Sequence, residues 1–246
     1  MAGCIEVSLN NKKSKMLEST TIMSHPTIHR SDITAPSIPL EVRMQPVKMR
    51  MYYKVHADIY DMTRWTFLFG RQRLLHMLPF SRTERIQIME IGSGTGYNLQ
   101  RLAQKYPKAK LIGWDVSEDM IRVSEENLAS VKNKLQLIIK PYGFGENIGD
   151  KADIILFSYC LSMVNPHWQD LILHAQKDLK PDGIIAVVDF DQTPVGLYRR
   201  FMRNNHVEIQ GQILPFLHQH FNPQKVSVHK AYGGFWQYFC FVGKLI

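Results

Sequence analysis

Ile86-Gln-Ile-Met-Glu-Ile-Gly-Ser-Gly-Thr-Gly-Tyr-Asn98 is the stretch that decides the fold of this 246-residue chain. Its first part, Ile86 to Ile91, is an apolar run with an acid, Glu90, near its end, and it predicts a buried strand. Alternate glycines follow at Gly92, Gly94 and Gly96. Apolar residues then recur at helical spacing, so the order strand, glycine turn, helix predicts the first unit of a nucleotide-binding α/β sheet.

The spacing of the glycines separates two kinds of cofactor. A dinucleotide fingerprint G-x-G-x-x-G would need its third glycine at position 97, which is Tyr97. The pattern E-x-G-x-G-x-G instead resembles the S-adenosylmethionine (SAM) loop of class I methyltransferases. The resemblance implies that SAM lies against this loop. The cofactor-binding residues that it implies here are Glu90, Gly92, Ser93, Gly94, Gly96 and Asn98.

A second acid supports the same interpretation. The apolar run Lys110 to Asp115 predicts the second strand, and Asp115 ends it about twenty residues beyond the loop. A carboxylate at this position can accept hydrogen bonds from both hydroxyl groups of a ribose. Ser117 predicts the N-cap of the next helix. Val116 and Met120 are placed to flank the adenine, although packing in the core would explain both equally well.

The rest of the chain predicts a complete doubly wound sheet. Further strands are expected at Leu135–Ile139, Ala152–Phe157 and Ile184–Asp189, and a helix is expected from Pro166, at its first position, to Leu179. Residues 225–229 and 235–242 predict a hairpin through the glycines at 233 and 234. The expected fold class is therefore α/β: a Rossmann-like class I methyltransferase with a mostly parallel seven-stranded sheet and a C-terminal antiparallel hairpin strand.

The chain divides into three expected parts. Residues 1–48 show no sustained periodicity and predict a mostly disordered extension. Residues 49–82 predict helices that precede the sheet, the second of them from Arg71 to Leu78, and residues 83–246 form the SAM-binding domain. By the resemblance, Tyr60 is expected over the cofactor. Arg64 could pair with the methionine carboxylate of SAM, because guanidinium matches a carboxylate bidentately, or could form an ordinary salt bridge.

Composition bounds the partners. The formal net charge of +8 favours an anionic partner, whether nucleic acid, a membrane surface or an acidic substrate, unless it is simply a basic surface. No apolar run reaches 18 residues and no secretory signal begins the chain, so a cytoplasmic protein without a membrane span is expected. Three scattered cysteines predict reduced thiols and no metal site.

The residues after the third and fourth expected strands are the ones expected to contact the adenine and the methyl acceptor. Tyr142 follows the third strand at the usual adenine edge, where many family members carry an acid. Ser158 and Tyr159 follow the fourth strand, which in this fold faces both cofactor and acceptor. Enzymes that methylate base amines usually carry Asn/Asp-Pro-Pro-Tyr/Phe at this point. Ser158-Tyr-Cys-Leu161 does not match, so a nucleic-acid substrate is not expected.

The segment Pro194–Arg203 mixes three arginines with Leu197, Phe201 and Met202. A basic amphipathic helix of this kind can lie on an anionic membrane, so peripheral contact at the inner membrane surface is one expectation. An ordinary surface helix with a solvated charged face is the other.

Three further stretches, 60–71, 206–215 and 231–236, resemble bacterial enzymes that N-methylate diacylglycerylhomoserine to make betaine lipids. The resemblance implies a lipid amine as the methyl acceptor. SAM carries the activation in such a reaction, so the protein mainly orients nucleophile, methyl and sulfur in line. The amine must be neutral to attack, and the candidate residues for that step are Tyr159, His206 and Asp189.

Three hypotheses follow for the function. The first is the lipid-amine methyltransferase, and the second is a methyltransferase for a quinone or another small hydrophobic acceptor. Both predict an aromatic acceptor pocket. The third is a SAM-binding module without catalysis, which would keep the glycine loop and Asp115, so that only turnover distinguishes it.

Overall fold

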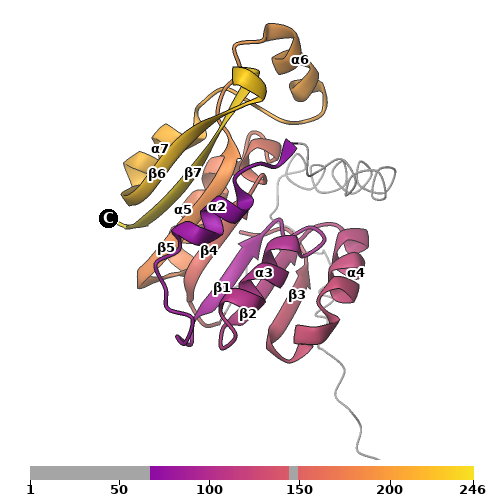
Figure 1. Ribbon diagram of the computed structural model, residues 1–246, viewed down its shortest axis with the longest axis vertical. Coiled ribbons are helices and arrows are strands. Elements are labelled where there is room, and N and C mark those ends of the chain that lie inside the picture. The colour runs from indigo at the N-terminus through magenta and orange to yellow at the C-terminus, as the bar shows by residue number, and fades with distance from the viewer. Residues whose placement is uncertain (1–66, 144–148) are drawn as a thin grey trace, which may run out of the picture.

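The computed structural model describes residues 67–143 and 149–246. They form one seven-stranded sheet in the order β3-β2-β1-β4-β5-β7-β6, with helices on both faces (Figure 1). The strands are β1 (Gln87–Ile91), β2 (Lys110–Asp115), β3 (Leu135–Ile139), β4 (Ala152–Ser158), β5 (Leu179–Phe190), β6 (Phe221–Ala231) and β7 (Trp236–Leu245). This is the predicted fold class.

One strand, β7, runs against the other six. The pairs among β3, β2, β1, β4 and β5 are all parallel, whereas β7 runs antiparallel to both β5 and β6. The parallel strands are buried on both faces, which explains their nearly unbroken apolar sequences. The C-terminal hairpin is confirmed, with the short helix η3 (Tyr232–Gly234) at its turn.

The helices form two layers around two apolar cores. The face covered by α2 (Arg71–Met77) and α3 (Tyr97–Lys105) holds one core, which also reaches α4 (Glu118–Asn127). The opposite face is covered by α5 (Trp168–Asp178) and α7 (Ile213–His220). The helix α6 (Gly196–Asn204) lies at one end of the molecule, beside the turn of the β6–β7 hairpin (Figure 1). The short helices η1 (Ala129–Lys134) and η2 (Leu161–Met163) complete the described elements.

Two of the predicted bounds that were wrong concern α5 and β5. The helix α5 begins at Trp168 and not at Pro166, because the carbonyl of His167 is the one that accepts the N–H of Leu171 (3.4 Å). Strand β5 begins at Leu179, which pairs with Ala152. The register then shifts, and the next pair is Ile184 with Ile154. The predicted turn therefore forms an irregular stretch inside the strand.

The carboxyl ends of β1 and β4 lie side by side where the strand order reverses. From β1 the chain leads through α3 to β2 on one side, whereas from β4 it leads through α5 to β5 on the other. A crevice opens at such a switch point in doubly wound sheets, and ligands bind there. The residues that directly follow β1 and β4 are Gly92 and Tyr159.

Candidate active site

The glycine loop after β1 is held in a tight left-handed path. Gly92, Gly94 and Gly96 have φ values of 70°, 52° and 79°, a region that residues with a Cβ rarely adopt. The carbonyl of Trp114 on β2 accepts the backbone N–H groups of Gly92 (2.7 Å) and Ser93 (3.1 Å). The loop is therefore fixed to the neighbouring strand before any ligand binds.

Asp115 fixes the other side of the loop. Its Oδ2 accepts the backbone N–H of Gly94 at 2.8 Å, and its Oδ1 accepts the N–H of Ser117 at 2.9 Å. Each carboxylate oxygen can accept more than one hydrogen bond, so ribose hydroxyls could be bound as well. Ser117 also caps α4, as predicted, by accepting the N–H of Met120 (3.3 Å).

Glu90 and Asn98 join the start of the loop to its end. The Asn98 side chain donates to Glu90 Oε1 at 2.7 Å, and both residues are buried. Asn98 Oδ1 is buried and has no hydrogen-bond partner among the residues that the structure describes. A polar ligand lying on the loop would satisfy it, so the donors and acceptors of this edge fit a cofactor such as SAM.

Cys160, which no sequence argument singled out, lies against the loop. A Cβ added to Gly92 would come within 2.7 Å of Cys160 Sγ. Burial raises the pKa of Cys160 well above its ordinary value, and the carboxylates of Asp189, Asp115 and Glu90 raise it further. Three acids, from β1, β2 and β5, therefore converge around one neutral thiol. The position could have been found from the rule that ligands lie at strand ends, because Cys160 comes directly after Tyr159.

Asp189 is the deepest of these acids and is fully buried near the end of β5. It accepts the backbone N–H groups of Ser162 (3.2 Å) and Phe190 (2.8 Å). These bonds favour the ionised form, but desolvation outweighs them and raises the pKa of Asp189 from 3.8 to about 6. The carboxyl group can therefore gain or lose a proton near neutral pH.

The raised pKa of Asp189 makes stability depend on pH. The folded protein holds this proton more tightly than the unfolded chain, so the stabilising contribution is complete below about pH 4 and is lost as the pH rises through about 6. A shift of this size corresponds to roughly 3 kcal/mol at most. We expect Asp189→Asn to flatten the fall in the free energy of unfolding over this window, as measured by urea denaturation. The exposed Asp182→Asn should keep the fall, and an equal fall in Asp189→Asn would contradict the assignment.

Tyr159 fixes the segment before α2 to the end of β4. Its φ is 54°, and its hydroxyl donates to the carbonyl of Phe69 at 2.8 Å. Its ring packs edge-on against Phe190 at 4.8 Å between centroids. Burial raises the pKa of Tyr159 well above its ordinary value, so the phenol stays protonated. Its part in catalysis stays a prediction.

A run of aromatic side chains continues outward from Tyr159. Phe69 packs against Trp236 (6.2 Å between ring centroids), which begins β7. Trp236 in turn stacks on Tyr198 of α6 at 5.6 Å. We call Tyr159, Phe190, Phe69, Trp236 and Tyr198 the aromatic path. It connects the switch point of the sheet with α6.

A buried arginine stands beside the helix that follows the loop. The guanidinium group of Arg71 on α2 lies 3.8 Å from the centre of the Tyr97 ring, and Tyr97 begins α3. Arg71 also acts electrostatically on Tyr159, so it lies near the end of β4 as well. Such a group is chemically suited to a carboxylate. Arg64, to which that role was predicted, and Tyr60 lie outside the described residues.

Other predicted site residues occupy different places. Val116, Met120 and Ser158 lie at the carboxyl edge with the loop. Tyr142 is buried against Trp114 (5.3 Å between ring centroids). Its hydroxyl donates a hydrogen bond to Asp178 of α5 (2.7 Å), so the hydroxyl proton is already used within the protein.

His206 lies at the end of α6. It is exposed, has a φ of 63°, and its N–H donates to the carbonyl of Arg203 (3.0 Å), so it terminates the helix. In residues 67–143 and 149–246, no group of three or more His, Cys, Asp or Glu residues is arranged to hold a metal ion.

Comparison with known proteins agrees with this geometry. Residues 89–185 match the family described as "Methyltransferase domain". The chain is 32% identical over 114 residues to an uncharacterized protein of Rickettsia prowazekii, covering 45% of each chain. It is 25% identical over 186 residues to the ubiquinone/menaquinone biosynthesis C-methyltransferase of Syntrophotalea carbinolica, covering 73% of this chain and 78% of that one. The chain thus spans less than half the length of the first relative.

Solved structures show the same fold. The 1,6-didemethyltoxoflavin-N1-methyltransferase of Burkholderia thailandensis, solved with S-adenosylhomocysteine, superimposes with a TM-score of 0.64 at 14% identity, over 87% of this chain and 93% of that one. The sheet order, the glycine loop, the acid at the end of β2 and the matched family together define the class. The chain carries a methyltransferase domain with the class I fold, and the residues of the loop and Asp115 fit SAM as the cofactor.

Proposed function

We propose that this protein transfers the methyl group of SAM to an amine in the head group of a lipid. The observation that carries the proposal is the aromatic path. It begins at Tyr159, beside the loop, and reaches Tyr198 on α6, which is only partly buried. An acceptor with an apolar body could pack against the partly exposed rings of the path, Phe69 and Tyr198, with its reacting end directed towards the loop.

The charges at the inner end of the path favour an amine. Glu90, Asp115 and Asp189 converge on Cys160, and their negative potential favours cationic groups over neutral ones. When bound, SAM supplies an electrophilic methyl group next to a positively charged sulfur. A protonated amine would be attracted to the same place but must lose its proton before it can attack.

The chain's own residues would perform three tasks. The glycine loop and Asp115 hold the cofactor, and the buried aromatic rings of Tyr159 and Phe190 exclude water from the reacting end. We assign proton uptake to Asp189, because its pKa of about 6 lets it take a proton near neutral pH. The methyl carbon then bonds to nitrogen as the carbon–sulfur bond breaks, and the sulfur keeps that electron pair.

A quinone or another small hydrophobic acceptor is the second candidate. The relative from Syntrophotalea carbinolica is named for quinone biosynthesis, and the similarity covers 73% of the chain described here. Such an acceptor would also suit the aromatic path but would gain little from the convergent carboxylates.

The test is to follow the methyl group. We expect the full chain, given methyl-labelled SAM and a bacterial extract, to place the label in the lipid fraction, on a head-group amine. The extract is separated into lipid, quinone, RNA, protein and small-molecule fractions. Label in quinones or in the small-molecule fraction would support the second candidate and reject the first, and label in the RNA or protein fraction would reject both.

Two controls sharpen this experiment. Asp115→Ala should lower the labelling in every fraction, because the cofactor binds less well. Purified diacylglycerylhomoserine in detergent should replace the extract as sole acceptor. If this lipid stays unlabelled while SAM binding is measurable by calorimetry, that particular amine is not the substrate.

A further inference from the structure

Apolar side chains gather in the open where α6 meets the β6–β7 hairpin. The exposed fractions are 83% for Leu197, 60% for Phe201, 59% for Tyr232, 42% for Phe235 and 41% for Phe67. We call these five residues the apolar tip. Monomeric soluble proteins seldom leave so many large apolar groups exposed together, and such patches mark interaction sites.

The tip is built on a rigid base. Trp236 is buried, and five rings surround it: Tyr232 at 4.8 Å between centroids, Tyr198 at 5.6 Å, Phe67 and Phe235 at 6.1 Å each, and Phe69 at 6.2 Å. Thr193 locks the two elements together. Its hydroxyl donates to the carbonyl of Phe235 (2.6 Å), and its carbonyl accepts from the Arg199 guanidinium (2.6 Å). The apolar side chains are therefore held outward by structure and do not need to be ordered on binding.

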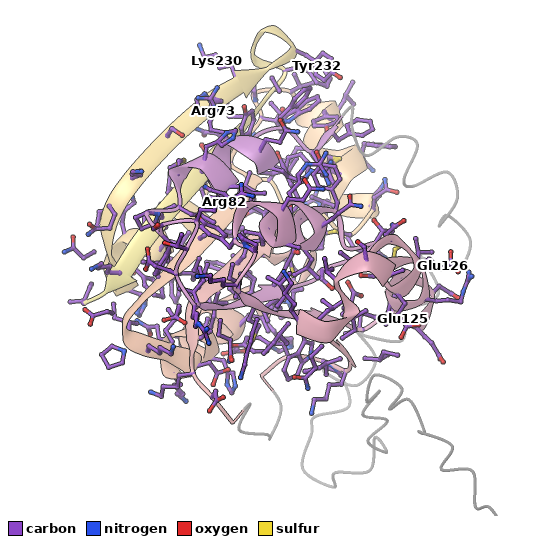
Figure 2. All side chains as sticks on the ribbon, turned by 60° about the horizontal axis from the view of Figure 1, so that its bottom comes forward. Arg73, Arg82, Glu125, Glu126, Lys230 and Tyr232 are labelled. Carbon is purple, nitrogen blue, oxygen red and sulfur yellow. The ribbon has the colours of Figure 1, made fainter. Side chains whose placement is uncertain are left out.

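The surroundings of the tip are basic and lack acids. No Asp or Glu occurs between Asp191 and Glu208, or anywhere after Glu208, although these segments carry Arg199, Arg200, Arg203 and Lys230. Figure 2 shows Lys230, Tyr232 and Arg73 at one side of the molecule, with Glu125 and Glu126 of α4 well away from them. These two segments therefore bring only positive formal charge to the tip.

We propose that the apolar tip docks on an anionic membrane surface. Leu197 and Phe201 are one turn apart on α6 and so point to the same side, where they can enter the boundary between head groups and acyl chains. Arg200, Arg203 and Lys230 contact the anionic head groups. Tyr232 is 59% exposed, and a tyrosine suits the boundary between head groups and acyl chains because its ring is apolar and its hydroxyl is polar.

Charge distinguishes a membrane from a protein partner. A protein interface usually places few charges at its centre, whereas Arg199 and Arg200 here stand between the exposed Leu197 and Phe201 along α6. No helix in the described parts of the chain has the length and hydropathy that crossing a membrane requires. The proposal therefore concerns binding from outside the bilayer, and it does not depend on which acceptor is methylated.

Vesicle co-sedimentation of the full chain tests the proposal without SAM or acceptor. We expect binding to phosphatidylcholine vesicles with about one-third phosphatidylglycerol, weaker binding to pure phosphatidylcholine, and a decrease with salt. Leu197→Glu/Phe201→Glu should lower the partition coefficient about tenfold or more. The matched control is Gln100→Glu/Gln104→Glu, which adds the same two charges at the same spacing on the exposed side of α3 and should bind as the wild type does.

Two results would overturn it. One is a wild-type chain that stays in the supernatant with anionic vesicles, as it would if another segment or protein covered the tip. The other is an equal loss of binding in Leu197→Glu/Phe201→Glu and in the control Gln100→Glu/Gln104→Glu. That result would indicate non-specific attraction by net charge. Arg200→Gln/Arg203→Gln is a second variant that leaves the apolar residues in place. It should weaken only the salt-dependent part of the binding to anionic vesicles. Calorimetric titration with SAM confirms that each variant is folded and separates loss of docking from loss of function.

Discussion

Replacing Gly96 by valine is expected to destabilise the folded protein by about 2–6 kcal/mol. Gly96 has a φ of 79°, which a β-branched residue adopts only with strain. A Cβ there would also come within 2.5 Å of Ser124 Oγ and 2.7 Å of Leu128 Cδ1, on and just after α4. The loop would have to move away from the helix to relieve both effects. Urea denaturation monitored by circular dichroism measures the change.

Gly149→Val separates the two causes. Gly149 has a similar φ of 76°, but nothing lies within 4 Å of its added Cβ. It should lose only the strain part, about 1–3 kcal/mol. If both variants lost the same amount, the close contact between the loop and α4 would contribute nothing.

Asp115→Ala is expected to weaken SAM binding by about 2–4 kcal/mol, which is a rise in Kd of about thirtyfold to about a thousandfold. A lost charge-assisted hydrogen bond to the ribose would account for part of this. The rest arises because Asp115 also accepts the backbone N–H groups of Gly94 and Ser117, so the variant loses the fixed shape of the loop. Isothermal titration calorimetry with S-adenosylhomocysteine gives the value.

Asp115→Asn is the informative companion. Its amide oxygen can still accept one of the two backbone N–H groups but carries no charge. We expect an intermediate Kd, while circular dichroism shows an unchanged fold for both variants. An Ala variant that is folded and binds as tightly as the wild type would remove Asp115 from the site.

The cofactor half of the fold could be predicted closely because its signals are local. The bounds of β2 and β3 agree with prediction because each is a short apolar run between polar turns. The hairpin half was harder. Strand β6 begins at Phe221, four residues before the predicted Lys225. Pro223 does not prevent pairing there, because β6 is an edge strand with a bulge, where proline is tolerated.

The site divides in the same way. The loop and Asp115 follow from spacing along the chain, whereas the contacts of Asp189 with Ser162 and of Tyr159 with Phe69 join residues far apart in sequence. Periodicity carries no information about such contacts. The amphipathic character of α6 was visible in the sequence, but its position beside the hairpin turn depends on Thr193 and on rings from three segments. The exposed aromatic residues of the turn could therefore not be assigned to the same surface.

The position of β7 has a consequence for the order in which the molecule matures. Strand β7 fills the gap between β5 and β6, and its first residues, with Gln237 bonded to Asp191 and Gln192, close the outer end of the aromatic path. During synthesis the cofactor half emerges first, and its pairings connect segments close together in the chain, whereas the other half waits for the last strand. We expect a nascent chain stalled before Trp236 to hold a nearly complete nucleotide-binding half beside an open sheet edge at β5. Such an intermediate is prone to aggregate, and a chaperone would be most useful to it at that stage.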